Sequence, residues 1–180
     1  MGEIEKIKTY FKKCYRIALN SEKQELIVWE DLKKLHDSNN WRSGFFEKDK
    51  MIESRFEIAE ELYQKYFHNI SNEGLKSSVC IFSNFDNEFA SDCFILASHF
   101  NNCLFDGKVV IHVNKNWVEY EMMTALITPL LNPIELEKQI SIHYHISLDV
   151  YQSFQRLLFE QEAPAIIIAD LIASKNKDKS

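Results

Sequence analysis

The spacing of apolar residues changes near Gly74, and this change constrains the fold more than any other feature of the chain. Before Gly74, apolar residues recur three or four positions apart, as on one face of a helix. After it, short apolar runs alternate with helical stripes. We therefore expect an α/β or α+β fold, in which a helix-rich N-terminal part packs on a small three- to five-stranded sheet with helices between the strands.

Residues 1–72 are predicted to form the helical N-terminal part. The first helix is expected over residues 3–19 and the second runs to about His36. A third helix is predicted between Asp49 and His68, because apolar side chains in that segment also follow helical spacing. The residues that define this third stripe are Ile52, Phe56, Ala59, Tyr63 and Tyr66.

Three apolar runs beyond Gly74 are predicted strands: residues 79–82, 109–113 and 140–146. Parallel pairing is the default for strands that alternate with helices, whereas a hairpin joining Val109 to Met122 would make the sheet mixed. Two segments stay ambiguous between helix and strand. They are residues 117–131, where both periods are present, and residues 165–172.

The acidic residues are concentrated in one part of the chain. Residues 73–173 hold thirteen Asp and Glu but five Lys and Arg, whereas residues 1–72 hold thirteen of each. A basic tail, residues 174–180, follows. We interpret residues 1–180 as a single domain with an acidic sheet-containing part. A field of negative sign repels phosphate and attracts basic surfaces, so we expect no nucleic-acid partner.

Several classes of protein are excluded by what the sequence lacks. The four glycines lie far apart, so neither a Walker loop nor a dinucleotide fingerprint is present, and no cofactor is expected. No stretch approaches the roughly 18 uninterrupted apolar residues of a membrane span, so we expect no membrane partner. The four cysteines show no paired CxxC spacing and are expected to be buried, reduced thiols, which indicates a cytoplasmic protein.

Candidate catalytic and metal-binding groups are few. On a strand, His143 and His145 would project from one face, and His112 from another strand would supply a third imidazole for a metal ion. The other interpretation is that these rings pack on a half-exposed face. No HExxH or CxxC motif accompanies them, so we favour packing and predict no metal. No nucleophile motif is present, and we predict no catalytic residue.

Two segments resemble parts of a TIR domain. Val79-Cys-Ile-Phe-Ser-Asn-Phe-Asp-Asn-Glu-Phe-Ala90 resembles its opening: a buried strand, a polar loop with an Asp, and Phe-Ala entering a helix. Val109-Val-Ile-His-Val-Asn-Lys-Asn-Trp-Val-Glu-Tyr-Glu121 is similar to the Trp-containing segment that carries the catalytic Glu of NAD-cleaving members. The resemblance implies that Glu121 or Glu119 stabilises an oxocarbenium-like ribose. An enzyme acting on NAD or a nucleotide is therefore the alternative function.

The acidic charge, together with a composition rich in Asn and Phe and poor in Gly and Ala, is similar to that of bacterial immunity proteins of contact-dependent inhibition systems. The resemblance implies a binding protein that neutralises a cognate toxin domain. A nuclease toxin has a basic cleft, which an acidic, aromatic-containing surface can fill. We predict contact residues at element starts and strand-to-helix loops, with Trp117 either an anchor or a core indole; they are Asp86, Glu88, Trp117, Glu119 and Glu121.

Overall fold

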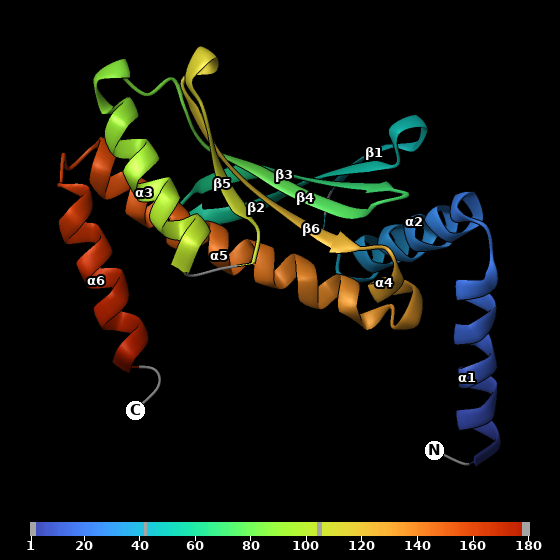
Figure 1. Cartoon of the computed structure of the whole chain (residues 1–180). Helices are drawn as coiled ribbons and strands as arrows, with labels where there is room; N and C mark the ends of the chain where they lie inside the picture. The colour runs from blue at the N-terminus through green and yellow to red at the C-terminus, as the bar shows by residue number, and fades with distance from the viewer. Residues whose placement is uncertain (1–2, 42, 104–105, 178–180) are drawn as a thin grey trace. The chain divides into compact units, whose positions relative to one another are not determined.

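The structure is a computed structural model that describes residues 3–41, 43–103 and 106–177 (Figure 1). Short 3-10 turns, η1 (Glu47–Asp49), η2 (Asn87–Phe89) and η3 (Val113–Lys115), connect some of the main elements. Those elements are α1 (Glu3–Ala18), α2 (Ser21–Ser38), β1 (Ser43–Phe46), β2 (Met51–Ala59), β3 (Leu62–Ser71), β4 (Gly74–Ser83), α3 (Ala90–Cys103), β5 (Lys108–His112), β6 (Trp117–Ala125), α4 (Ile127–Leu131), α5 (Ile134–Leu158) and α6 (Pro164–Lys177).

The strands form one six-stranded antiparallel sheet in the order β1-β2-β3-β4-β6-β5. Of the two expected classes, α/β or α+β, the structure has the α+β class, and the sheet is larger than the expected three to five strands. Strands β5 and β6 form a hairpin in which Val109 lies opposite Tyr120. The antiparallel pairing therefore replaces the parallel default, because short turns rather than long crossovers connect most neighbouring strands.

The helix predicted between Asp49 and His68 is wrong, because this segment lies mostly in strands β2 and β3. Its buried positions follow period two, but some of them are polar. Ser54 lies between apolar neighbours on the inward face of β2, and His68 does so on β3. A hydrophobic pattern therefore missed the alternation. The tight turn between these strands uses Glu61 at φ 60°, a conformation that Gly or Asn usually signals.

The strand predicted over residues 140–146 is also wrong, because this segment lies within helix α5. In and just after this segment, the buried residues Ile140, His143 and Ser147 follow helical spacing, and two of the three are polar. The ambiguous segments are now assigned. Residues 117–125 are strand β6 and 127–131 are helix α4, while residues 165–172 lie in helix α6.

The chain contacts divide into two compact units, each built from separate stretches of sequence. The first comprises Met1–Phe56, Lys65–Ser77 and Met123–His143, and the second comprises Glu57–Gln64, Ser78–Met122 and Tyr144–Ser180. Strands β2, β3, β4 and β6 and helix α5 each contribute to both units.

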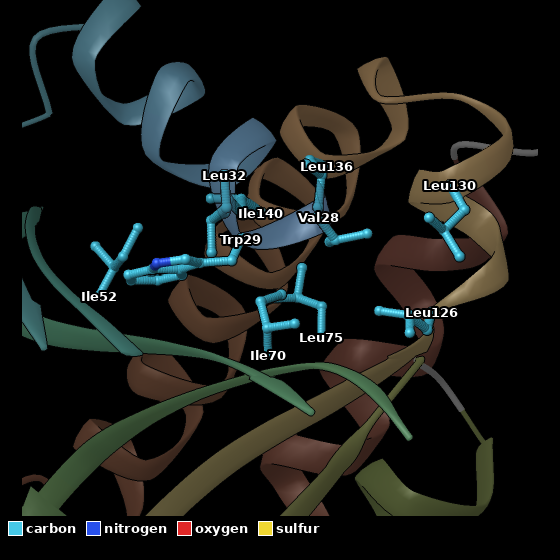
Figure 2. Packing of buried hydrophobic residues seen from close by; sticks show 10 residues of the cluster. All are labelled: Val28, Trp29, Leu32, Ile52, Ile70, Leu75, Leu126, Leu130, Leu136 and Ile140. Atoms are coloured by element: carbon cyan, nitrogen blue, oxygen red, sulfur yellow. The ribbon is translucent and has the colours of Figure 1, made fainter. Parts of the chain in front are cut away.

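The apolar core of the first unit gathers side chains from α2, α4, α5 and the sheet. Figure 2 shows Trp29 of α2 between Ile52 and the aliphatic side chains of the neighbouring elements. The Trp29 indole donates a hydrogen bond to Glu47 Oε2 at 2.8 Å, so its one polar atom is satisfied. The ten buried members are Val28, Trp29, Leu32, Ile52, Ile70, Leu75, Leu126, Leu130, Leu136 and Ile140.

A polar strip lies beside this core. His36 Nδ1 lies 3.2 Å from Ser54 Oγ, and His68 Nδ1 lies 2.9 Å from Ser77 Oγ. The His36 and His68 ring centroids are 5.7 Å apart, and the His143 centroid lies 6.3 Å from that of His68. All five side chains are buried. Buried imidazoles held by hydroxyl groups require the neutral form, because burial penalises the charged one.

Candidate partner-binding site

Strand β6 places three of the predicted contact residues on one face of the sheet. Trp117, Glu119 and Glu121 are partly exposed, while the alternating Val118, Tyr120 and Met122 are buried. Trp117 begins the strand as expected. The predicted position of Glu119 and Glu121 is wrong. Both lie inside strand β6 and not in a loop or at the start of an element.

Both strand carboxylates have side-chain neighbours on β5. Glu121 Oε1 lies 2.7 Å from Lys108 Nζ, and this hydrogen bond raises the pKa of Lys108. Glu119 Oε2 lies 2.8 Å from His112 Nε2. The face of the hairpin is therefore a cross-strand network of both signs. Its carboxylates offer a partner less net negative charge than the sequence count indicated.

Trp117 is held against its own hairpin. Its ring packs edge-on against His112 at 5.2 Å between centroids, and Lys115 Nζ lies 4.3 Å from its ring centroid. The indole Nε1 is buried and has no hydrogen-bond partner within the described part of the chain. Trp117 thus combines the two sequence interpretations: the ring is packed, yet the residue is only partly covered.

The loop that carries Asp86 and Glu88 lies next to the start of β6. The Phe85 amide donates to the Asn116 carbonyl at 3.0 Å, which joins this loop to the residue before Trp117. Asp86 accepts a hydrogen bond from the Glu88 amide at 3.3 Å and caps the turn that leads into α3. Both carboxylates are exposed, so these two predicted residues are available to a partner.

An aromatic pocket adjoins the same loop, and sequence reasoning missed it. The Phe82 ring stacks on that of Tyr151, with 5.0 Å between the ring centroids. Its centroid also lies 5.6 Å from that of Phe159. Phe159 is 71% exposed and directly follows α5, far along the chain, so no local signal indicated the pocket. Its lining residues are Phe82, Ser83, Asn84, Phe85, Asp86, Phe89, Leu158 and Phe159.

The three histidines that could have formed a metal site, His112, His143 and His145, do not come together as the strand interpretation required. His143 is buried and His145 is exposed, because residues two apart on a helix point in nearly opposite directions. His112 lies against Glu119. Within residues 3–41, 43–103 and 106–177, no group of three or more His, Cys, Asp or Glu residues is placed to hold a metal ion.

The thiols of Cys80 and Cys93 are poor nucleophiles. Burial raises the pKa of Cys93 to about 12, and burial together with the Glu119 carboxylate raises that of Cys80. Cys14 is exposed, which corrects the expectation that all the cysteines are buried. Cys103 lies outside the residues whose side chains the structure describes.

The geometry of the two TIR-like segments is now visible. Val79-Cys-Ile-Phe82 lies in β4 and leads through η2 into α3, as the resemblance implies. The second segment is the β5–β6 hairpin, in which Lys108 and His112 contact the two glutamates.

No protein-family model matches the chain, and neither does any curated protein or solved structure. No helix in the described part of the chain is long and apolar enough to cross a membrane.

Proposed function

We propose that this protein binds a basic protein partner, and that the partner is a cognate toxin domain of nuclease type that it neutralises. The observation that carries the proposal is the pairing of two exposed carboxylates, Asp86 and Glu88, with an aromatic pocket in the same loop. A lysine or arginine side chain suits such a site. Its aliphatic stem packs on phenylalanine rings while its charge meets Asp86.

The surrounding residues support the same kind of partner. Trp117 adjoins the loop through the Phe85–Asn116 hydrogen bond and adds a partly exposed aromatic group. Glu119 and Glu121 extend the polar surface, but Lys108 offsets part of the charge of Glu121, and Glu119 already has His112 as a partner. We therefore place the electrostatic weight on Asp86 and Glu88 and expect charge attraction to speed capture of the partner.

The test compares immobilised wild-type protein with an Asp86→Asn/Glu88→Gln variant in capture from a lysate of the source cell. Asparagine preserves the helix-start cap, so the variant removes charge without removing the local fold. We expect the wild type to capture a basic protein with nuclease activity and to inhibit that activity. The variant should associate with it about tenfold more slowly at low salt.

A Glu60→Gln/Glu137→Gln variant is the matched control. It removes two negative charges at exposed positions that belong neither to the loop nor to the pocket lining, and it should capture the partner as the wild type does. Equal loss in both variants would show that only net charge matters and would contradict this site. Release of nicotinamide from NAD by the purified protein would favour the enzymatic alternative.

A further inference from the structure

Helix α1 exposes its entire apolar face. The sequence predicted this helix correctly, but it also implied that the apolar stripe packs on the sheet, and the structure corrects that expectation. The stripe is exposed along its length, with Ile4 73%, Ile7 55%, Tyr10 65%, Phe11 65% and Tyr15 66% exposed. An exposed apolar face of this size marks a site of interaction.

The helix is attached to the first unit through its opposite face. Arg16 is buried, forms an ion pair with Asp31 of α2, and donates to the Pro129 carbonyl of α4 at 3.4 Å. At about 100° per residue, Arg16 points away from Ile7 and Phe11. The anchor therefore uses the polar side and leaves the apolar side for another surface; Figure 1 shows α1 leading away from the start of α2.

Cations border the apolar face on both sides. On a helical wheel Lys8 and Lys12 follow one edge of the stripe, and Lys6 and Lys13 follow the other. The helix holds five Lys and Arg against two Glu, a net charge of +3, whereas the whole chain carries −6. The remainder of the chain therefore carries −9, so α1 differs in sign from the rest of the protein.

This arrangement favours one occupant. Pairing of α1 with α1 of a second copy would bring lysine rows against lysine rows along both edges of the contact, which is unfavourable. An anionic lipid surface satisfies both features, because acyl chains receive the apolar side chains while lysines reach the headgroups. A helix that lies in the interface plane need not span the bilayer.

We propose that α1 binds an anionic lipid surface with Ile4, Ile7 and Phe11 inserted below the headgroups and its lysines among them. The inference is independent of the toxin-binding site. It departs from the expectation of no membrane partner, which followed from the lack of a spanning stretch, because an interfacial helix needs no such stretch.

Sedimentation of the full chain with phosphatidylcholine vesicles, with and without phosphatidylserine, tests the proposal. We expect binding to the vesicles that contain phosphatidylserine, and weaker binding at high salt or without the anionic lipid. Lys8→Gln/Lys12→Gln should weaken binding roughly 10- to 30-fold, because each basic residue near an anionic surface contributes separately. Phe11→Glu should weaken it about tenfold or more, because it removes an inserted side chain and adds a negative charge.

The matched control is Ile134→Glu, which changes an apolar residue of α5 that is 72% exposed. It should leave vesicle binding unchanged, and circular dichroism should show all variants folded, since each mutated side chain is exposed. The proposal is overturned if no binding occurs to either vesicle at low salt, or if Phe11→Glu binds like the wild type. A dimer in solution that Phe11→Glu dissociates, without vesicle binding, would assign the face to a second copy.

Discussion

Buried histidines are the residues that most distinguish this core. Burial lowers the pKa of His36 to about 4, with a small opposing effect from Asp37. Burial, followed by the neighbouring His143 and His36, lowers the pKa of His68 well below its ordinary value. In the unfolded chain both histidines titrate near 6.5. The unfolded state therefore binds more protons than the folded state between these values, and stability falls as the pH falls.

We expect each of these two histidines to cost about 2 kcal/mol of unfolding free energy between pH 7 and pH 5. Urea unfolding at the two pH values measures this loss. His36→Gln should reduce the pH-dependent loss by about half, whatever its effect on stability at pH 7. The exposed His145→Gln serves as the control and should leave the loss unchanged. Equal stability of the wild type at both pH values would contradict the prediction.

The same residues explain why part of the sequence-based prediction was wrong. Ser54 and His68 interrupt the apolar alternation of β2 and β3, and His143 interrupts the helical stripe of α5. Each is buried through tertiary partners that lie far away in sequence, such as the His36–Ser54 pair. A hydrophobic pattern assigns polar residues to the outside, so it selected the wrong period.

At the scale of elements, the start of β4 depends on Gly74. This residue has φ +147°, and a Cβ there would lie 2.0 Å from the Thr124 carbonyl oxygen of β6. We expect Gly74→Ala to lower the free energy of unfolding by about 3 kcal/mol or more, through both strain and overlap with backbone.

Thermal or urea unfolding measures this effect, and Gly44→Ala provides the matched comparison. A Cβ at Gly44 would meet only side-chain atoms of Phe46, at 3.4 Å, and Glu53, at 3.9 Å. That variant should change stability by about 0.5 kcal/mol or less. Similar effects of the two substitutions would show that the close approach of β4 to β6 contributes little.

Arg156 joins the end of α5 to α6. Its Nε and Nη2 lie 2.6 and 2.9 Å from the Glu162 carboxylate oxygens, and Nη2 lies 2.6 Å from Asp170 Oδ2. These hydrogen bonds raise the pKa of Arg156, so the guanidinium stays charged throughout the working pH range. The two-pronged contact depends on guanidinium geometry, which lysine does not reproduce.

We expect Arg156→Gln and Arg156→Lys to lower stability by about 1 kcal/mol, because the network is partly exposed. Amide protons of α6 should exchange faster in both variants. Lys138→Gln is the control. Its ion pair with Glu135 is 3.7 Å long and Lys138 is 63% exposed, so α6 exchange should not change. Protection of α6 that persists in Arg156→Gln would assign its docking to apolar contacts instead.

At the scale of the whole molecule, neither compact unit is a continuous piece of chain. The first unit combines Met1–Phe56 with Lys65–Ser77 and Met123–His143. The second combines Glu57–Gln64 with Ser78–Met122 and Tyr144–Ser180. The Tyr144 hydroxyl, for example, donates to the Glu57 carbonyl at 2.6 Å within the second unit.

We therefore predict that residues 73–173, expressed alone, do not fold into a stable structure. The fragment lacks strands β1, β2 and β3 and so exposes an unpaired edge of β4. A narrow, poorly dispersed amide spectrum and a sloping thermal transition are expected, whereas the full chain should show a cooperative one. A well-dispersed spectrum of the fragment would contradict the prediction.

The fold of the whole molecule decides which of its acidic side chains are accessible to a partner. The acidic excess of residues 73–173 was countable from the sequence, but its availability was not. Glu119 and Glu121 have the side-chain partners His112 and Lys108 because β5 and β6 form a hairpin in register, while Asp86 and Glu88 are exposed in a loop. Two of the four predicted carboxylates are therefore the main candidates for partner contact.

The sequence by itself determined that helices combine with a sheet, the amphipathic character of α1 and the uneven charge. These properties depend on local spacing, turn chemistry and counting, which neighbours in the chain specify. Tertiary structure decided that residues 51–59 and 62–71 are strands, that residues 140–146 are helix, and that the apolar face of α1 is exposed. These properties depend on which distant surfaces meet, because burial of a side chain is a property of its partners as well as of its own hydrophobicity.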